Sequence, residues 1–156
     1  MEIFSVSFFG HRSLYGCGFV DQKVYEIICD LIRNKSYVEF LVGRDGDFDQ
    51  IVSSAIIRAK RNIDHGNASH IWIMPYMKAE YKNNKMAFEK YYDFIEVCEK
   101  SSVAFPKSAI TIRNRYMIER SDMCIFYVTE KSGGAWNAMQ YAEKIGKAYI
   151  NIAMLQ

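Results

Sequence analysis

The sequence predicts an α/β protein, a single three-layer domain over residues 1–156 with a mostly parallel sheet and helices on both faces. Two observations indicate this class. Short, continuous apolar runs, typical of strands buried on both faces, alternate with longer segments whose apolar residues recur at helical spacing. No repeat, linker or low-complexity tract divides the chain, and its 156 residues suit one domain.

Strands are expected where the apolar runs are rich in β-branched and aromatic residues. These runs are residues 3–9, 38–42, 70–75, 123–128 and 148–153. Gly10, Gly43 and Pro75 end the first three of them, since glycine and proline commonly interrupt regular structure. His65 and His70 flank the polar turn DHGNAS and are expected at the surface.

Helices are expected where apolar residues recur every three or four positions. These segments are residues 20–32, 48–59, 85–98, 109–120 and 135–146. Asp47 is the expected N-cap of the second helix, because a carboxylate at that position accepts the free N–H groups of the first turn. Phe105-Pro106 is expected to break the chain before the fourth helix.

The amino-acid composition and the net charge exclude several classes of protein. Half of the residues are hydrophobic and 24% are charged, which excludes a disordered chain, and the net charge is only +2. We therefore expect a cytoplasmic protein for which neither nucleic acid nor membrane is a partner. The four cysteines are Cys17, Cys29, Cys98 and Cys124, and none forms a CxxC pair. Three of them sit in apolar surroundings and are expected as small buried hydrophobic residues.

Polar segments that contain glycine follow three of the predicted strands, at the edge where open parallel sheets bind ligands. Ser132, Gly133 and Gly134 precede the last helix. Because glycine permits close approach of the backbone and a helix N-terminus presents free N–H groups, they are expected to hold an anion. A Gly-Gly pair is also a common turn, and that alternative stays open. The sequence contains neither GxGxxG nor a Walker A motif.

Side chains at the same strand ends are the expected ligand contacts. Arg12 and Arg113 would neutralise a phosphate, although Arg12 could instead pair with a carboxylate at the sheet rim. Asp49 would hydrogen-bond a sugar hydroxyl, or only favour its helix dipole. The expected ligand-binding residues are Gly10, His11, Arg12, Gly43, Gly46, Asp49, Arg113, Asn114, Ser132, Gly133, Gly134 and Asn137. No cofactor or metal site is expected, apart from a Mg²⁺ ion carried by the phosphate.

Four stretches, in this order along the chain, resemble the SLOG superfamily and are most similar to its YpsA-like branch. They are FFGHR (8–12), VGRDGDFDQIVSSA (42–55), RNRYMIERSDMCIFYV (113–128) and SGGAWNAMQYAEKIGKAYINI (132–152). This Rossmann-like group includes the DNA-processing protein DprA and the "lonely guy" enzymes. The resemblance implies a nucleotide-derived ligand, with its phosphate at the Gly133-Gly134 helix start, and a homo-oligomer, either a dimer or a tetramer.

The resemblance also bears on catalysis. Enzymes of the superfamily cleave the N-glycosidic bond of a nucleoside monophosphate with a PGGxGTxxE motif and an arginine. Arg113 matches that arginine, but Gln140 stands at the glutamate. Because a neutral amide cannot stabilise an oxocarbenium-like state or transfer its proton, we expect ligand sensing. The alternatives are an N-glycosidase with Asp49 or Glu119 as a divergent acid, and a scaffold that binds no ligand.

Overall fold

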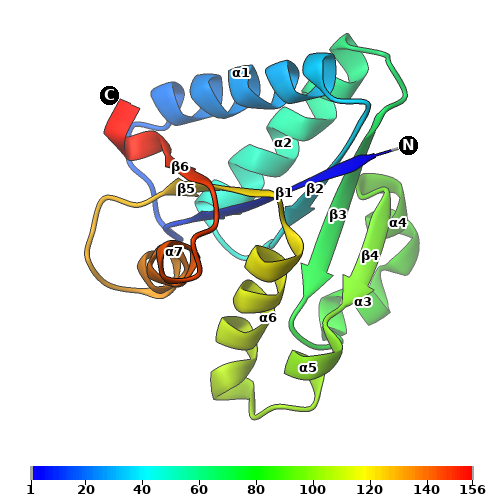
Figure 1. The fold of residues 1–156 in the computed structure, drawn as a ribbon. Helices are drawn as coiled ribbons and strands as arrows, with labels where there is room; N and C mark the ends of the chain where they lie inside the picture. The colour runs from blue at the N-terminus through cyan, green and yellow to red at the C-terminus, as the bar shows by residue number, and fades with distance from the viewer. Residues whose placement is uncertain (1, 156) are drawn as a thin grey trace.

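A computed structural model describes residues 2–155 and confirms the α/β class, with six parallel strands in one sheet (Figure 1). The strands are β1 (Ile3–Gly10), β2 (Tyr37–Val42), β3 (Ala68–Met74), β4 (Phe94–Val97), β5 (Met123–Tyr127) and β6 (Tyr149–Asn151). Their order across the sheet is β4-β3-β2-β1-β5-β6. This arrangement is the doubly wound type that the alternating apolar runs predict.

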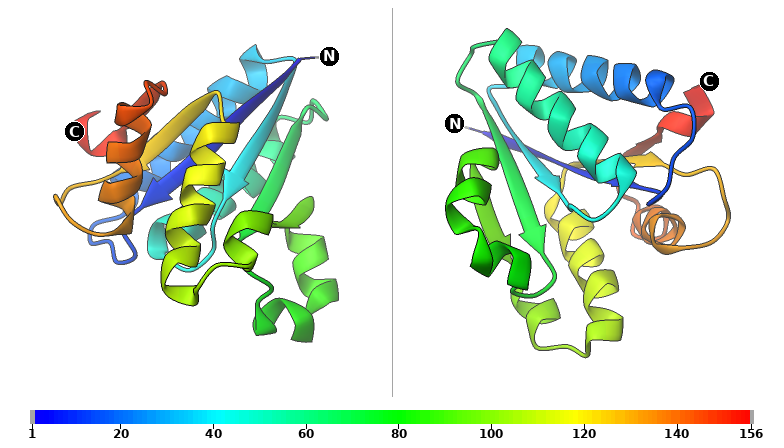
Figure 2. Two further views of the ribbon diagram at one scale, coloured as in Figure 1. Left: turned by 60° about the horizontal axis from the view of Figure 1, so that its bottom comes forward. Right: turned by 180° about the vertical axis from the view of Figure 1, so that it is seen from behind.

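Helices cover both faces of the sheet. They are α1 (Gly18–Asn34), α2 (Asp47–Asn62), α3 (Ala79–Asn83), α4 (Lys85–Tyr91), α5 (Glu99–Ser102), α6 (Pro106–Arg120) and α7 (Gly134–Lys144), followed by the 3-10 turn η1 (Ile152–Leu155). Helices α1 and α2 lie on one face, and α6 and α7 lie on the other (Figures 1 and 2). No helix within residues 2–155 is long and apolar enough to cross a membrane.

Strand β1 shows why the sheet must be covered on both faces. Val6 and Phe8 pack into the core under α1 and α2, whereas Phe9 packs into the core under α6 and α7. Ser7, also on the second face, is fully buried and its hydroxyl is within 2.5 Å of the Ser121 hydroxyl. The buried hydroxyl is thereby satisfied, so the apolar run can contain serine without an energetic penalty.

The prediction of one helix over residues 85–98 is wrong for the second half of that segment. Helix α4 ends at Tyr91, and β4 then pairs with β3, with Ile71 opposite Phe94. The N–H of Asp93 donates to the carbonyl of His70 (2.8 Å), which redirects the chain along the sheet. Apolar spacing alone could not distinguish one long helix from a short helix followed by a four-residue strand.

The surface position expected for His70 is also wrong, although His65 is exposed. Strand β3 begins at Ala68, so His70 lies inside the strand and only 1% of its surface is exposed. Its Nε2 lies 2.9 Å from the Ser53 hydroxyl, and its buried Nδ1 has no hydrogen-bond partner among residues 2–155. Burial lowers the pKa of this imidazole to about 4, because the charged form would lose its hydration.

Asp47 does not cap α2 as expected. It is the first residue of the helix, after the N-cap Gly46. Its carboxylate instead accepts the N–H of Leu14 (3.0 Å), and its own N–H donates to the carbonyl of Arg12 (2.8 Å). Asp47 therefore joins the start of α2 to the loop that follows β1.

Other local expectations agree with the structure. Pro106 begins α6, where its missing N–H costs nothing. Cys29, Cys98 and Cys124 are buried, as expected for small hydrophobic residues. Burial raises the pKa of the Cys124 thiol to about 12, so this cysteine stays protonated and unreactive.

The strand order places the switch point of the sheet between β1 and β5. From β1 the chain adds β2, β3 and β4 on one side, then crosses to β5 and β6 on the other. The loops after β1 and β5 must leave in opposite directions from adjacent strands, and a crevice opens between them.

Candidate ligand-binding site at the switch point

A cavity of about 740 Å³ lies at the carboxyl ends of the central strands. Its size is within the range of sites for small organic ligands, roughly 300–1,000 Å³. The structure places these expected contact residues in its lining: Gly10, His11, Arg12, Gly43, Asp49, Arg113, Asn114, Ser132, Gly133 and Gly134. They come from four separate parts of the chain, and their role in binding stays a prediction.

Two of the expected residues, Gly46 and Asn137, are not in the lining. A Cβ atom on Gly46 would lie 2.9 Å from the Cα of Arg12, so this glycine permits close packing of two loops. Asn137 lies in the first turn of α7 with an exposed side chain, and its N–H donates to the carbonyl of Gly133 (3.0 Å). Neither position therefore faces the cavity.

The start of α7 has the properties of an anion site. Gly133, the N-cap, has φ +94°, a conformation that side chains with a Cβ rarely adopt. A Cβ on Gly134 would have no neighbour within 4 Å. The N–H groups of Gly134, Ala135 and Trp136 precede the first intrahelical hydrogen bond and have no acceptor in the helix. Free donors, open space and the positive end of the helix dipole thus coincide.

His11 holds the loop before this helix. Its Nε2 accepts the N–H of Thr129 (2.9 Å) and lies 3.3 Å from the N–H of Glu130, which connects the end of β1 to the loop after β5. Two donors require an unprotonated Nε2, so the ring proton is on Nδ1. On the other side of the loop, Asn151 exchanges two hydrogen bonds with the backbone of Val128, both 3.0 Å.

Removing the His11 imidazole is expected to loosen the loop without unfolding the protein. In His11→Ala both N–H groups lose their protein acceptor, which costs about 1 kcal/mol because water can replace it. Hydrogen exchange of residues 129–133 should become faster, whereas exchange in β3 should not change. His11→Gln, which keeps an acceptor, is the control; equal exchange in wild type and His11→Ala would contradict this role.

Asp49 and Arg113 form the polar floor of the cavity on either side of Gly43. A Cβ on Gly43 would lie 3.1 Å from Asp49 Oδ2 and 3.6 Å from Arg113 Nη2. Arg113 donates to the carbonyl of Ile73 (2.7 Å) and to Asn114 Oδ1 (2.9 Å). Among the described residues, Asp49 and Arg113 make no direct ion pair.

Burial dominates the electrostatics of this floor. It raises the pKa of the Asp49 carboxyl to about 6, although the positive charge of Arg113 opposes the shift. Burial also lowers the pKa of Arg113, and the charge of Asp49 opposes that change. The floor therefore carries a permanent cation beside a carboxyl that titrates close to neutrality, and Arg113 Nη2 has no protein acceptor within residues 2–155.

Several lining residues were not expected from the sequence. They are Phe8, Phe9, Ser13, Leu14, Tyr15, Asp45, Ile110, Met117, Tyr127, Thr129 and Glu130. Thr129 and Glu130 directly follow a predicted strand, so the strand-end argument could have included them. Ile110 and Met117 project from the side of α6, and no local signal in the sequence indicates that they reach the cavity.

The residues considered for glycosidic cleavage are not brought together. Gln140 is exposed and lies outside the cavity lining. Glu119 also lies outside it and accepts a hydrogen bond from the Tyr141 hydroxyl (2.6 Å). Of the three candidate acidic positions, Asp49, Glu119 and Gln140, only Asp49 lines the same cavity as Arg113. Within residues 2–155, no group of three or more His, Cys, Asp or Glu residues is placed to hold a metal ion, and a phosphate-bound Mg²⁺ stays a prediction.

Comparison with solved structures identifies the fold as the Rossmann-like fold of DNA-processing protein A. One similar structure is DprA from Helicobacter pylori, with a TM-score of 0.63 and 18% identity over 94% of this chain. Another is DprA from Streptococcus pneumoniae, with a TM-score of 0.67 and 15% identity over 94% of this chain. This chain spans 63% and 49% of the lengths of those two chains, respectively.

Sequence comparison adds no closer relationship: no family model and no curated protein matches this sequence. The structural likeness supports the SLOG resemblance at the level of the fold, and the YpsA-like branch stays a prediction. It also corrects one expectation. The H. pylori protein is described as binding single-stranded DNA, so the exclusion of nucleic acid as a partner on the basis of net charge was wrong. A net charge does not describe the local charge of a binding surface.

Proposed function

We propose that this protein binds a small phosphate-bearing ligand of the nucleotide class in the switch-point cavity and acts as a sensor of it. The phosphate would lie against the first turn of α7, and the remainder of the ligand would extend towards Asp49 and Arg113. The observation that carries this proposal is the open space at Gly134 beside N–H groups that have no acceptor in the helix.

The cavity's charges support an anionic ligand with polar groups at some distance from its phosphate. Arg12 and Arg113 are the cationic residues of the lining, and Arg113 is held in place by two hydrogen bonds to the protein. The lining also contains the carboxyl groups of Asp45, Asp49 and Glu130, which can accept hydrogen bonds from hydroxyl or amino groups. A ligand that combines a phosphate with several hydrogen-bond donors, such as a nucleotide, matches this distribution.

A side chain at Gly134 is expected to abolish ligand binding and leave the fold intact. Gly134→Asp places a carboxylate in the open space, where it fills the phosphate position and repels the anion. An aspartate is well tolerated in the first turn of a helix, so the thermal midpoint without ligand should change little. Thermal unfolding with nucleoside monophosphates and cyclic nucleotides tests this, since a ligand at about 100 times its Kd adds about 2.7 kcal/mol.

Asn137→Asp is the matched control, because it adds the same charge to the same helix turn outside the cavity lining. Loss of binding in Gly134→Asp but not in Asn137→Asp supports the phosphate position. Equal binding in wild type and Gly134→Asp would contradict it. Chromatography of the recovered ligand distinguishes the alternatives: intact nucleotide agrees with a sensor, whereas free base would show a glycosidase.

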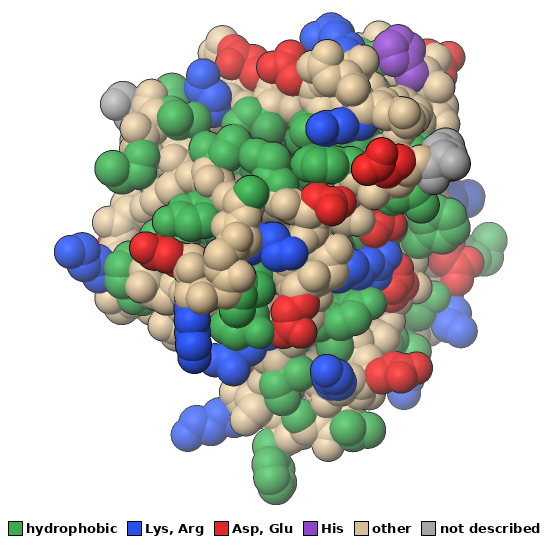
Figure 3. Space-filling view, viewed as in Figure 1, with side chains coloured by type: hydrophobic (Ala, Val, Ile, Leu, Met, Phe, Trp, Pro, Cys, Tyr) green, Lys and Arg blue, Asp and Glu red, His purple; other side chains and the backbone are tan. Residues whose placement is uncertain are grey.

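A second candidate function is binding of single-stranded nucleic acid, which the fold shared with the H. pylori protein favours. The same cavity would then receive one nucleotide of a strand. Figure 3 shows positive and negative side chains interspersed over the visible face, without an extended basic stripe on that face. Strand binding predicts a strong decrease in affinity with salt, roughly in proportion to the phosphates contacted, whereas a single mononucleotide predicts a small one.

The sensing part of the proposal requires a response that other molecules can detect. Val103 and Phe105, on the turn between α5 and α6, are 88% and 84% exposed. Two exposed apolar side chains on one turn can contribute to a contact surface if a larger apolar patch surrounds them. We propose that ligand binding changes the assembly of a homo-oligomer, and sedimentation with and without nucleotide measures this.

A further inference from the structure

Tyr15 is the most exposed large hydrophobic side chain in residues 2–155, with 93% of its surface in contact with solvent, and it also lines the cavity. A tyrosine ring usually gains stability by packing its faces against other groups. At the edge of a polar cavity, an uncovered ring is suited to contact a bound molecule.

The loop that carries Tyr15 is anchored on both sides of it. Before the ring, the N–H of Leu14 donates to the Asp47 carboxylate (3.0 Å). After it, Gly16 adopts φ +64°, and the carbonyl of Cys17 accepts the N–H of Asp21 as α1 begins (2.9 Å). Tyr15 therefore projects from a short bridge between two anchored points, which limits the ring to the neighbourhood of the cavity.

Tyr15 differs from the other aromatic rings of the lining because its faces are free. Phe8, Phe9 and Tyr127 are buried and stack on core rings, with centroid separations of 5.9, 5.3 and 6.2 Å to Phe40, Phe126 and Phe48, respectively. No aromatic pair or cation–π contact within the described part of the chain involves Tyr15. Of the Phe and Tyr rings in the lining, it is the one that can receive a planar group.

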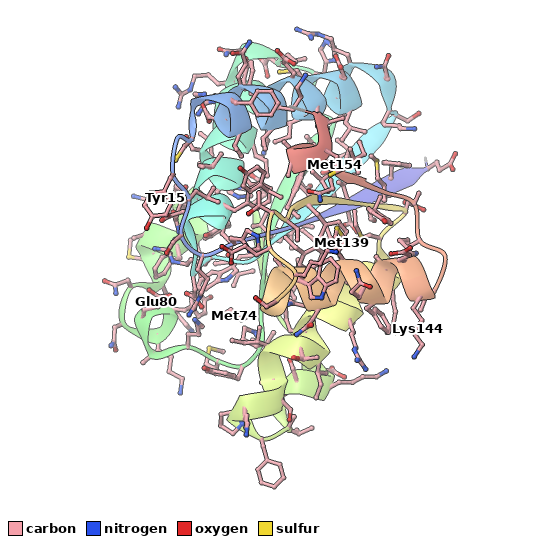
Figure 4. All side chains as sticks on the ribbon, turned by 90° about the vertical axis from the view of Figure 1, so that its left-hand side faces the viewer. Tyr15, Met74, Glu80, Met139, Lys144 and Met154 are labelled. Atoms are coloured by element: carbon pink, nitrogen blue, oxygen red, sulfur yellow. The ribbon has the colours of Figure 1, made fainter. Side chains whose placement is uncertain are left out.

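Tyr15 and the proposed phosphate position belong to the same cavity. In Figure 4, Tyr15 lies at the left of the view, on the same side as the start of α7. Lys144, at the other end of α7, lies at the right of the view. Both Tyr15 and Gly134 line the cavity of about 740 Å³. A ligand with its phosphate at α7 can thus place a second group near the tyrosine ring.

We propose that Tyr15 stacks on the planar heterocycle of the bound molecule, so that the ligand is a nucleoside phosphate and not a sugar phosphate or a bare anion. This inference rests on the phosphate position proposed at α7. Tyr15 supplies affinity for the base, and the helix N-terminus supplies affinity for the phosphate. Because every base has a π-face, stacking by itself accepts any of them.

Calorimetric titration with AMP, GMP and ribose 5-phosphate tests this inference on the full chain. Ribose 5-phosphate retains the sugar and phosphate of the nucleotides but lacks the base. Tyr15→Ala should weaken nucleotide binding about tenfold, as expected for loss of one base-aromatic stack, and leave ribose 5-phosphate binding unchanged. Tyr15→Trp should retain nucleotide binding. Phe94→Ala, which removes another exposed aromatic ring outside the cavity lining, should change neither.

The outcomes separate this inference from the proposed function. If Tyr15→Ala weakens all ligands equally, or none, while Gly134→Asp abolishes binding, the stacking role is wrong and the phosphate position stands. If wild type binds neither nucleotides nor ribose 5-phosphate, both proposals fail. If Tyr15→Ala weakens binding of an oligothymidylate but not of AMP or GMP, the ligand is a polynucleotide and the nucleoside phosphate assignment is overturned.

Discussion

Gly10→Ala is expected to destabilise the protein by about 3 kcal/mol, at the upper end of the usual cost of overpacking a core. The added Cβ would lie 2.3 Å from Cγ and 2.6 Å from Cβ of Phe48. Phe48 is fully buried at the start of α2 and stacks on Tyr127, so it cannot move aside without disturbing the core. The thermal midpoint should fall by roughly 10 °C, since each kcal/mol corresponds to about 2–4 °C in a domain of this size.

The matched control is Gly134→Ala, because its added Cβ would have no neighbour from another part of residues 2–155 within 4 Å, and the midpoint should change little. A double-mutant cycle identifies the cause. Phe48→Ala removes the ring that the added methyl group would contact, so the two substitutions together should cost clearly less than their sum. Additive costs, or a Gly10→Ala variant as stable as wild type, would show that the close contact with Phe48 does not determine this position.

The second large effect is an opposing pair of pH dependences from His70 and Asp49. The folded-state pKa of His70 is about 4, below its ordinary value of 6.5, so its contribution to stability is complete above 6.5 and is lost as the pH falls towards 4. The folded-state pKa of Asp49 is about 6, above its ordinary 3.8. Its contribution is therefore complete below 3.8 and is lost as the pH rises through 6.

Each contribution to the free energy of unfolding is on the order of 3 kcal/mol. Between pH 4 and 6 the His70 contribution rises with pH while the Asp49 contribution falls, so the two changes nearly cancel. Substituting one of the two residues should therefore reveal the pH dependence of the other. Relative to wild type, His70→Gln should lose stability as the pH rises from 4 to 6, and Asp49→Asn should gain it. Urea unfolding at intervals across this range measures both differences.

Comparing each variant with wild type removes the contributions of the other carboxyl groups, which all three proteins share. His65→Gln is the control for the histidine substitution, because His65 is exposed. Stability curves for His70→Gln and Asp49→Asn that run parallel to wild type would refute the shifted pKa values of these two groups. A parallel curve for one variant alone would refute that group only.

Most of the fold could be predicted from the sequence because its strands are continuous apolar runs. A parallel sheet buried on both faces requires such runs. The runs that begin at residues 3, 38, 70 and 123 are mostly apolar, and each coincides with a strand. Strand β4 was missed because its four residues follow Tyr91 and Tyr92 at a spacing that also fits a helix. Its identity as a strand depends on pairing with β3, which is a long-range interaction.

The general location of the candidate site was also accessible from the sequence. Parallel strands place their carboxyl ends at one edge, so the glycine-containing segments after 9, 42 and 128 had to approach one another. The aromatic ring at Tyr15 and the cavity wall from Ile110 and Met117 were not accessible in this way. Their positions depend on how the loop after β1 and the side of α6 face the cavity, which local periodicity does not encode.

By itself, the sequence determined the α/β class and the edge of the sheet that carries the polar glycine loops. These properties follow from local patterns and residue identity. Only the tertiary structure decided that His70 is buried, that Gly10 is needed for Phe48, and that His11 binds the backbone of Thr129. Each of these depends on residues far apart in the chain, and such contacts form only when the sheet brings its strands and helices together.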